Sequence, residues 1–288
     1  MLFEKPEQFL DQPRHAVTVF GMAGVGKTHL SALLRRNNWF HFSGDYRIGT
    51  RYMGEFIVDN FKREAMKVPF LRDLLRSDSI YISSNITFAN LDPLSTYLGA
   101  PGDPEKGGLP LAEYQRRQEQ HRVAEINAIK DIPYFIDRAK DLYGYNDFIA
   151  DTGGSLIEVL DPADPEDDVV KTLSEHTLLL YIRGTDGDAD ALIERYRRAP
   201  KPMYYRPQLL VEKWAEFKKL NGIESDNDVD PAAFAVWGFE AILRDRLPRY
   251  QALADNFGYT IEANDVSTVR DHTDFMDLMR KAIAARVK

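Results

Sequence analysis

The chain has 288 residues, 44% of them hydrophobic and 28% charged, and this composition excludes a disordered or fibrous chain. It has no cysteine, so disulfides, thiolate metal sites, iron–sulfur clusters and cysteine nucleophiles are excluded as well. Acidic residues outnumber basic ones by 45 to 37, and the net charge of −8 disfavours binding to a nucleic-acid backbone. No apolar run is long enough to span a bilayer, and the N-terminal segment is too charged for a signal peptide. We therefore expect a cytoplasmic protein with no nucleic-acid or membrane partner.

The first part of the chain predicts a strand, a helix and a second strand. Residues 16–20 are apolar and rich in β-branched side chains, leucines at helical spacing predict a helix that begins near Lys27, and residues 39–42 predict the next strand. From 57 to 112 the sequence changes to short apolar pieces and a stretch rich in proline and glycine. We interpret 57–112 as an insertion into a single domain whose core spans about 15–56 and 113–288.

The remainder of the chain alternates between helical and strand patterns. Helices are predicted over 112–140, 189–198, 207–221, 231–257 and 274–288, and strands over 147–150, 176–183 and 258–265. Strands that alternate with helices favour a three-layer α/β fold with a parallel central sheet and right-handed crossovers. The insertion is expected to be helical or irregular.

Residues 21–28, GMAGVGKT, fit the phosphate-binding pattern G-x-x-x-x-G-K-[ST] between a predicted strand and a predicted helix. Glycines let backbone N–H groups close around phosphate oxygens, and the helix N-terminus adds partial positive charge. Lys27 is expected to reach the β- and γ-phosphates, and the Thr28 hydroxyl to ligate Mg²⁺. A guanine-specific N/T-K-x-D motif is absent, which favours ATP. The predicted nucleotide contacts are Gly21, Gly24, Val25, Gly26, Lys27, Thr28, His29 and, from a later helix, Arg195.

Polar residues and glycines follow two other predicted strands. Asp151 comes after strand 147–150, where it could hold Mg²⁺ through water, although an ordinary strand-to-helix turn is the alternative. Gly153 and Gly154 would let a substrate approach the backbone closely. Asp45 follows strand 39–42 at the same sheet edge, where it could accept a proton from a substrate hydroxyl or cap the next helix.

Basic residues gather in the segment 195–206, which also contains prolines and two tyrosines. Such a segment could close as a lid over a transferring phosphoryl group and stabilise its charge. The alternative is a solvated helix face. The five basic residues are Arg195, Arg197, Arg198, Lys201 and Arg206.

Taken in order, these motifs resemble those of P-loop kinases of the shikimate-kinase type, over about 15–50 and 112–285. Ser43-Gly44-Asp45 matches the family's Asp-x-Asp at its second aspartate, the segment from Arg122 to Glu125 matches its R-x-x-E, and Gly153-Gly154-Ser155 stands for its glycine triplet. The segments 206–209 and 246–250 resemble its lid and closing motifs. The resemblance implies that Asp45, Arg122, Gly153, Gly154 and Arg246 face the phosphate acceptor and that Arg206 is the lid arginine.

We therefore predict an ATP- and Mg²⁺-dependent kinase with a P-loop kinase fold that phosphorylates a hydroxyl of a small, anionic molecule. Lys27, Asp45 and Arg206 would be catalytic, and Arg122 and Arg246 would pair with a carboxylate or phosphate of the acceptor. Because the insertion lies where the family binds its acceptor, we expect an acceptor other than shikimate. The alternatives are a kinase of a macromolecular hydroxyl, and a P-loop ATPase or regulator in which ATP only orders the lid.

Overall fold

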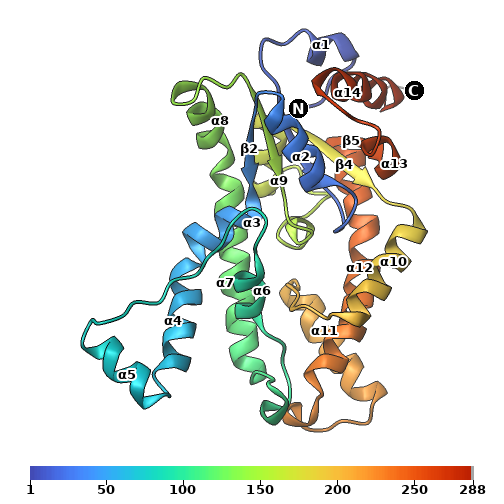
Figure 1. Ribbon diagram of the computed structural model, residues 1–288. Helices are drawn as coiled ribbons and strands as arrows, with labels where there is room; N and C mark the ends of the chain where they lie inside the picture. Colours follow the sequence, from blue (N-terminus) through green and yellow to red (C-terminus); the bar gives the residue numbers. More distant parts are fainter. Residues whose placement is uncertain (287–288) are drawn as a thin grey trace.

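The computed structural model describes residues 1–286, so the last two residues of the predicted closing helix lie outside it (Figure 1). At its centre is one sheet of five parallel strands in the order β2-β3-β1-β4-β5. The predicted parallel α/β class is confirmed, and every predicted strand is present within two or three residues. The strands are β1 (Ala16–Phe20), β2 (Trp39–Ser43), β3 (Asp147–Asp151), β4 (Leu178–Arg183) and β5 (Gly258–Glu262).

Helices cover both faces of this sheet. Helix α2 packs on β2 and β3, and α14 packs on β5; helices α8, α9 and α12 pack against the opposite face. No helix in residues 1–286 has the length and hydropathy that crossing a membrane requires. The helices are α1 (Pro6–Leu10), α2 (Lys27–Arg36), α3 (Gly44–Arg47), α4 (Gly54–Ala65), α5 (Pro69–Arg76), α6 (Asp92–Leu98), α7 (Leu111–Lys130), α8 (Ile132–Asp141), α9 (Asp168–His176), α10 (Asp186–Arg198), α11 (Pro207–Leu220), α12 (Pro231–Phe257), α13 (Ala263–Val266) and α14 (His272–Arg286), with shorter turns η1 (Ile48–Tyr52), η2 (Pro104–Lys106), η3 (Leu156–Glu158) and η4 (Asp226–Asp228).

The single helix expected over 112–140 is divided into α7 and α8 at Asp131. Pro133 lies in the first turn of α8, where its missing N–H removes no intrahelical hydrogen bond. The Asp131 carboxylate accepts hydrogen bonds of 2.7 Å from both Arg47 and Tyr52. These contacts attach the segment after β2 to the junction of the two helices.

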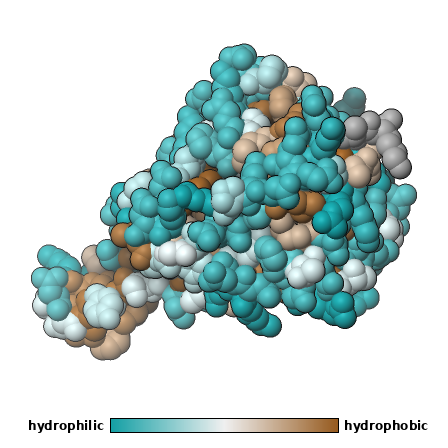
Figure 2. All heavy atoms as spheres, turned by 90° about the horizontal axis from the view of Figure 1, so that it is seen from above, coloured by the Kyte–Doolittle hydropathy of each residue, from teal (hydrophilic) through white to brown (hydrophobic). Residues whose placement is uncertain are grey.

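The segment between β2 and α7 has two parts. Helices α4 and α5 project from the body as an arm (Figure 1), and apolar atoms gather on the arm at the left of Figure 2. Phe70 of α5 and Tyr81 in the segment that follows α5 are 68% and 88% exposed. Helix α6 instead packs against α7, where Leu94 and Tyr97 join a small core with Ala124 and Ala128.

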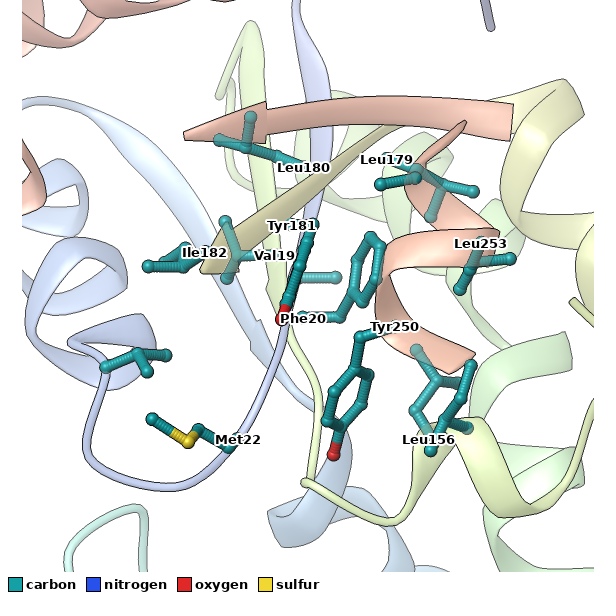
Figure 3. Packing of buried hydrophobic residues seen from close by; sticks show 14 of the residues in the cluster. Val19, Phe20, Met22, Leu156, Leu179, Leu180, Tyr181, Ile182, Tyr250 and Leu253 are labelled. Atoms are coloured by element: carbon teal, nitrogen blue, oxygen red, sulfur yellow. The ribbon is translucent and has the colours of Figure 1, made fainter. Parts of the chain in front are cut away.

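The sheet core continues under the loop that follows β1. The rings of Phe20 and Tyr181 stack with centroids 5.4 Å apart, and Tyr181 stacks on Tyr250 of α12 at 5.8 Å. Figure 3 shows Tyr250 beside them with its hydroxyl pointing away from the sheet. That hydroxyl donates a hydrogen bond to the carbonyl of Gly154, so the core fixes the loop after β3 next to the loop after β1.

Candidate active site

The loop between β1 and α2, residues 21–26, is called the phosphate loop below, and its backbone has the conformation that phosphate binding requires. Gly21, Gly24 and Gly26 have φ values of 138°, 90° and 100°, a region that side chains rarely adopt. A Cβ atom at Gly21 would also lie 2.6 Å from the carbonyl oxygen of Ile182. The predicted contacts Val25, Thr28 and His29 belong to the same loop and first helical turn; Val25 is buried, and Thr28 and His29 are exposed.

Lys27 is buried beneath this loop. Its Nζ donates hydrogen bonds of 2.8 Å to the carbonyls of Gly21 and Met22. Burial lowers the pKa of Lys27, and the carboxylates of Asp151 and Asp45 oppose that shift. The lysine is therefore held at the same sheet edge as the two aspartates that the sequence singled out.

Asp151 is the last residue of β3 and pairs in register with Val19 of β1, which places it directly beside the phosphate loop. It is 5% exposed, and its Oδ2 lies 3.4 Å from Nε2 of His41. In residues 1–286 no three histidine, aspartate or glutamate side chains gather as a metal-binding cluster. Magnesium at a phosphate loop needs fewer protein ligands, because phosphate oxygens and waters complete its shell. The Thr28 hydroxyl at the helix N-terminus fits this requirement.

Asp45 is the second residue of α3, and Ser43 caps that helix by accepting the N–H of Tyr46 at 3.4 Å. Asp45 is therefore not needed as the cap, which was the alternative interpretation. Burial and the nearby Asp151 raise the pKa of Asp45 to about 6, while Lys27 opposes the rise. Its side chain lies against Gly153, where any Cβ atom would overlap Oδ1 of Asp45.

Helix α7 brings His121 and Glu125 to the same region. Glu125 Oε1 accepts a hydrogen bond of 2.8 Å from Ser155. Burial and the Asp45 carboxylate raise the pKa of Glu125 to about 8. Burial and Arg246 lower the pKa of His121 to about 3, and its ring stacks on Tyr204 with centroids 4.7 Å apart. Both shifts favour the uncharged form of the side chain.

Arg122 was expected to face the acceptor, and the structure places it elsewhere. One position along an α-helix turns the side chain by about 100°, so Arg122 leaves the helix in a different direction from His121. Its guanidinium binds Glu119 at 2.7 and 2.8 Å on the outer side of α7. The helical spacing of His121 and Glu125 was the sequence signal for the inward face, and it was missed.

Arg246 and Arg206 are both held by Glu158, a buried residue of η3 that the sequence analysis did not select. Arg246 is 5% exposed; its Nε donates to Glu158 Oε1 at 2.7 Å and its Nη2 to the Tyr204 carbonyl at 2.7 Å. Arg206 binds Asp245 at 2.9 Å and lies 3.4 Å from Glu158. In this conformation Arg206 is engaged by carboxylates and not by the phosphate loop.

A cavity of about 620 Å³ opens beside the phosphate loop. Five predicted residues, widely separated in the sequence, meet around it together with Met22 and Ala23 of the loop; Arg122 and Arg206 are not among its lining residues. Arg195 of α10 reaches over the loop, with its guanidinium nitrogens 3.7 and 3.9 Å from the position of a Cβ at Gly24. The five predicted lining residues are Asp45, Gly153, Gly154, Arg195 and Arg246.

No protein-family model and no curated protein sequence matches the chain. Among solved structures, the chain is similar to a shikimate kinase from Bacteroides thetaiotaomicron, with 16% sequence identity and a TM-score of 0.36 over 95% of this chain and 94% of that chain. At that TM-score the likeness is weak, so the functional proposal rests on the geometry of the site.

Proposed function

We propose that the protein is an ATP- and Mg²⁺-dependent phosphotransferase that moves the γ-phosphoryl group of ATP to a hydroxyl of a small molecule. The observation that carries this proposal is the position of the cavity, which shares Met22 and Ala23 with the phosphate loop and has the Asp45 carboxylate in its wall. ATP hydrolysis alone needs only a water molecule, and a cavity of this size is typical of a site for a second, organic substrate.

On the nucleotide side, the loop from Gly21 to Gly26 and the N-terminus of α2 would bind the phosphates through backbone N–H groups. Lys27 would exchange its two loop carbonyls for phosphate oxygens. Thr28 and Asp151 would hold Mg²⁺, the latter through water, and the ion would neutralise charge on the β- and γ-phosphates. Arg195 is the cation best placed to stabilise the transferring group.

On the acceptor side, Asp45 would accept the proton of the attacking hydroxyl. The acceptor oxygen forms a bond to the γ-phosphorus, the bond from that phosphorus to the β–γ bridging oxygen breaks, and ADP leaves. A carboxyl group with a pKa of about 6 is mostly ionised at pH 7 and remains a stronger base than an ordinary aspartate. The absence of a side chain at Gly153 leaves room for Asp45 in this position.

ADP release in the presence of sugars, polyols, nucleosides and apolar alcohols tests the proposal. We expect at least one class of alcohol to stimulate release, and we expect the stimulation to disappear in both Lys27→Ala and Asp45→Asn. Tight ATP binding without stimulation by any alcohol would favour the alternative of a nucleotide-binding regulator.

A further inference from the structure

We infer that the acceptor is a neutral alcohol with a largely apolar body, and this inference rests on the proposed phosphotransferase function. The walls of the cavity are built from α6, α10, the segment 199–204 and α12, and most of their side chains are hydrophobic. Burial of apolar ligand surface against such walls is the main source of affinity that they offer. Representative wall residues are Leu94, Leu98, Leu192, Phe239, Ile242 and Leu243.

The walls are well ordered by their own packing. Tyr196 of α10 and Phe239 of α12 stack with ring centroids 3.8 Å apart and planes inclined by only 3°. Leu94 of α6 is held on α7 by the small core that it shares with Ala124. The hydrophobic surface of the cavity is thus provided by packed helices, and α6 belongs to the segment inserted between β2 and α7.

The cations around the cavity leave no partner for an anionic acceptor. Arg246 is already bound by the Glu158 carboxylate and the Tyr204 carbonyl. Lys201, at the exposed rim, pairs with Asp92 at 2.9 Å. Arg195 forms no ion pair with any residue between 1 and 286, but it lies over Gly24, where the nucleotide phosphates would bind. An acceptor carboxylate would therefore lose its water without gaining a counter-ion.

Polar groups interrupt the apolar lining of the cavity, and some of them come from the loop after β3 and from α7. Asp45, Ser155, His121 and Tyr204 are among the lining residues. His121 Nδ1 and the Tyr204 hydroxyl are buried and have no hydrogen-bond partner among the described residues. His121 Nδ1 faces the equally buried Glu125 Oε2 at 3.7 Å, whereas the Tyr204 hydroxyl has no such neighbour. Buried polar atoms are normally paired, so the Tyr204 hydroxyl fits a hydroxyl group of an otherwise apolar ligand.

Two ligands that differ by one carboxylate group test the inference on the unaltered full-length protein. The first is 2-naphthylmethanol, and the second is the same alcohol with a carboxylate at the far end of its ring system. Their binding is measured by calorimetry in the presence of Mg²⁺ and a non-hydrolysable ATP analogue. We expect the neutral alcohol to bind at least about tenfold more tightly, because the carboxylate would be desolvated without a partner.

Substitutions at Leu192 test whether the ligand binds in the cavity. Leu192→Asn adds a polar side chain to its wall and should weaken binding of 2-naphthylmethanol about tenfold or more, whereas Leu192→Met should bind nearly as the parent does. Leu220→Asn is the matched control, because Leu220 is 66% exposed on α11 and is not a lining residue. Circular dichroism verifies that each variant is folded.

Equal or tighter binding of the carboxylated alcohol overturns the inference, and so does failure of the neutral alcohol to bind. Binding of the ATP analogue is measured separately in the parent and in Lys27→Ala. If the analogue does not bind the parent, the proposed phosphotransferase function fails; if it binds and the neutral alcohol is not preferred, only the nature of the acceptor is wrong.

Discussion

The carboxylate of Asp45 lies so close to Gly153 that the glycine cannot carry a side chain while the aspartate keeps its position. A Cβ atom at Gly153 would overlap Oδ1 of Asp45 and come within 3.1 Å of Ser155 Oγ. Asp45 follows β2 and Gly153 follows β3, and these strands are neighbours in the sheet. The contact therefore depends on strand pairing and positions the proposed base.

Gly153→Ala should displace Asp45 and lower kcat by at least about tenfold with little loss of ATP affinity, since a small misplacement of a reacting group is costly. Gly154→Ala is the comparison. A Cβ there would be 3.5 Å from its nearest atom, the Tyr250 hydroxyl, which is an ordinary contact. Steady-state kinetics on both variants measure the difference in kcat. A larger loss of kcat in Gly154→Ala than in Gly153→Ala would contradict this account.

The pH profile should report on Asp45. Because the proposed base must be ionised, kcat/KM should rise with pH and level off above about pH 6, the pKa to which burial and Asp151 raise this carboxyl. Asp45→Asn should lose both the activity and this limb of the profile, while binding of a non-hydrolysable ATP analogue remains. An unchanged acidic limb in the residual activity of Asp45→Asn would assign the titration to another group.

Arg195 and Arg206 should differ in what they contribute. Arg195→Ala should lower kcat by roughly 10³-fold with a smaller effect on ATP binding, as expected for a cation that acts on the transferring group. Arg206→Ala should instead reduce the free energy of unfolding by about 1–3 kcal/mol, because Asp245 loses its partner and Glu158 loses one of two. Arg198→Ala, at an exposed position of the same helix as Arg195, serves as the control. Turnover rates and urea denaturation curves of the variants test this assignment. Loss of turnover in Arg206→Ala but not in Arg195→Ala would contradict it.

Glu125 should make the stability depend on pH. In the unfolded chain it releases its proton near pH 4.5, whereas in the folded protein burial and Asp45 raise its pKa to about 8. Between these values the unfolded state binds fewer protons, so this residue makes the free energy of unfolding fall as pH rises, by up to about 1.4 kcal/mol per pH unit. Glu125→Gln cannot titrate and should remove that slope.

Urea denaturation of the parent and of Glu125→Gln at pH 5, 6.5 and 8 measures the difference. Contributions from titrating groups that do not interact with Glu125 are common to both proteins, so the difference between the two curves reports on Glu125 and its coupling to Asp45. Parallel curves across the three pH values would mean that Glu125 is ionised in the folded protein.

Much of the fold could be predicted from local patterns in the sequence. The five strands are short apolar runs, as expected where helices cover both faces of a parallel sheet. The phosphate loop has a specific pattern of glycines and a lysine. Asp45, Asp151 and Gly153 could be placed at one sheet edge because each lies at or just after the carboxyl end of a strand in a parallel sheet.

The parts of the site that were not predicted depend on orientation and on long-range contacts. Arg122 and His121 are adjacent in the sequence, and only the rotation of α7 decides which of them faces the cavity. The engagement of Arg246 and Arg206 by Glu158 joins segments 88 and 48 residues apart, for which local sequence offers no signal. The apolar walls likewise combine α6, α10 and α12, which local sequence patterns do not bring together.

The central claim is that the γ-phosphoryl group of ATP passes to an organic hydroxyl at this site. Phosphorus NMR of the protein with ATP, Mg²⁺ and a mixture of polar, anionic and apolar alcohols tests it directly. The account predicts ADP together with a new phosphomonoester signal, and the loss of both in Lys27→Ala, whose fold is verified by circular dichroism. Lys140→Ala, at an exposed position of α8 outside the cavity lining, is the control and should behave as the parent. ADP accompanied only by inorganic phosphate, or a phosphomonoester that persists in Lys27→Ala, would contradict it.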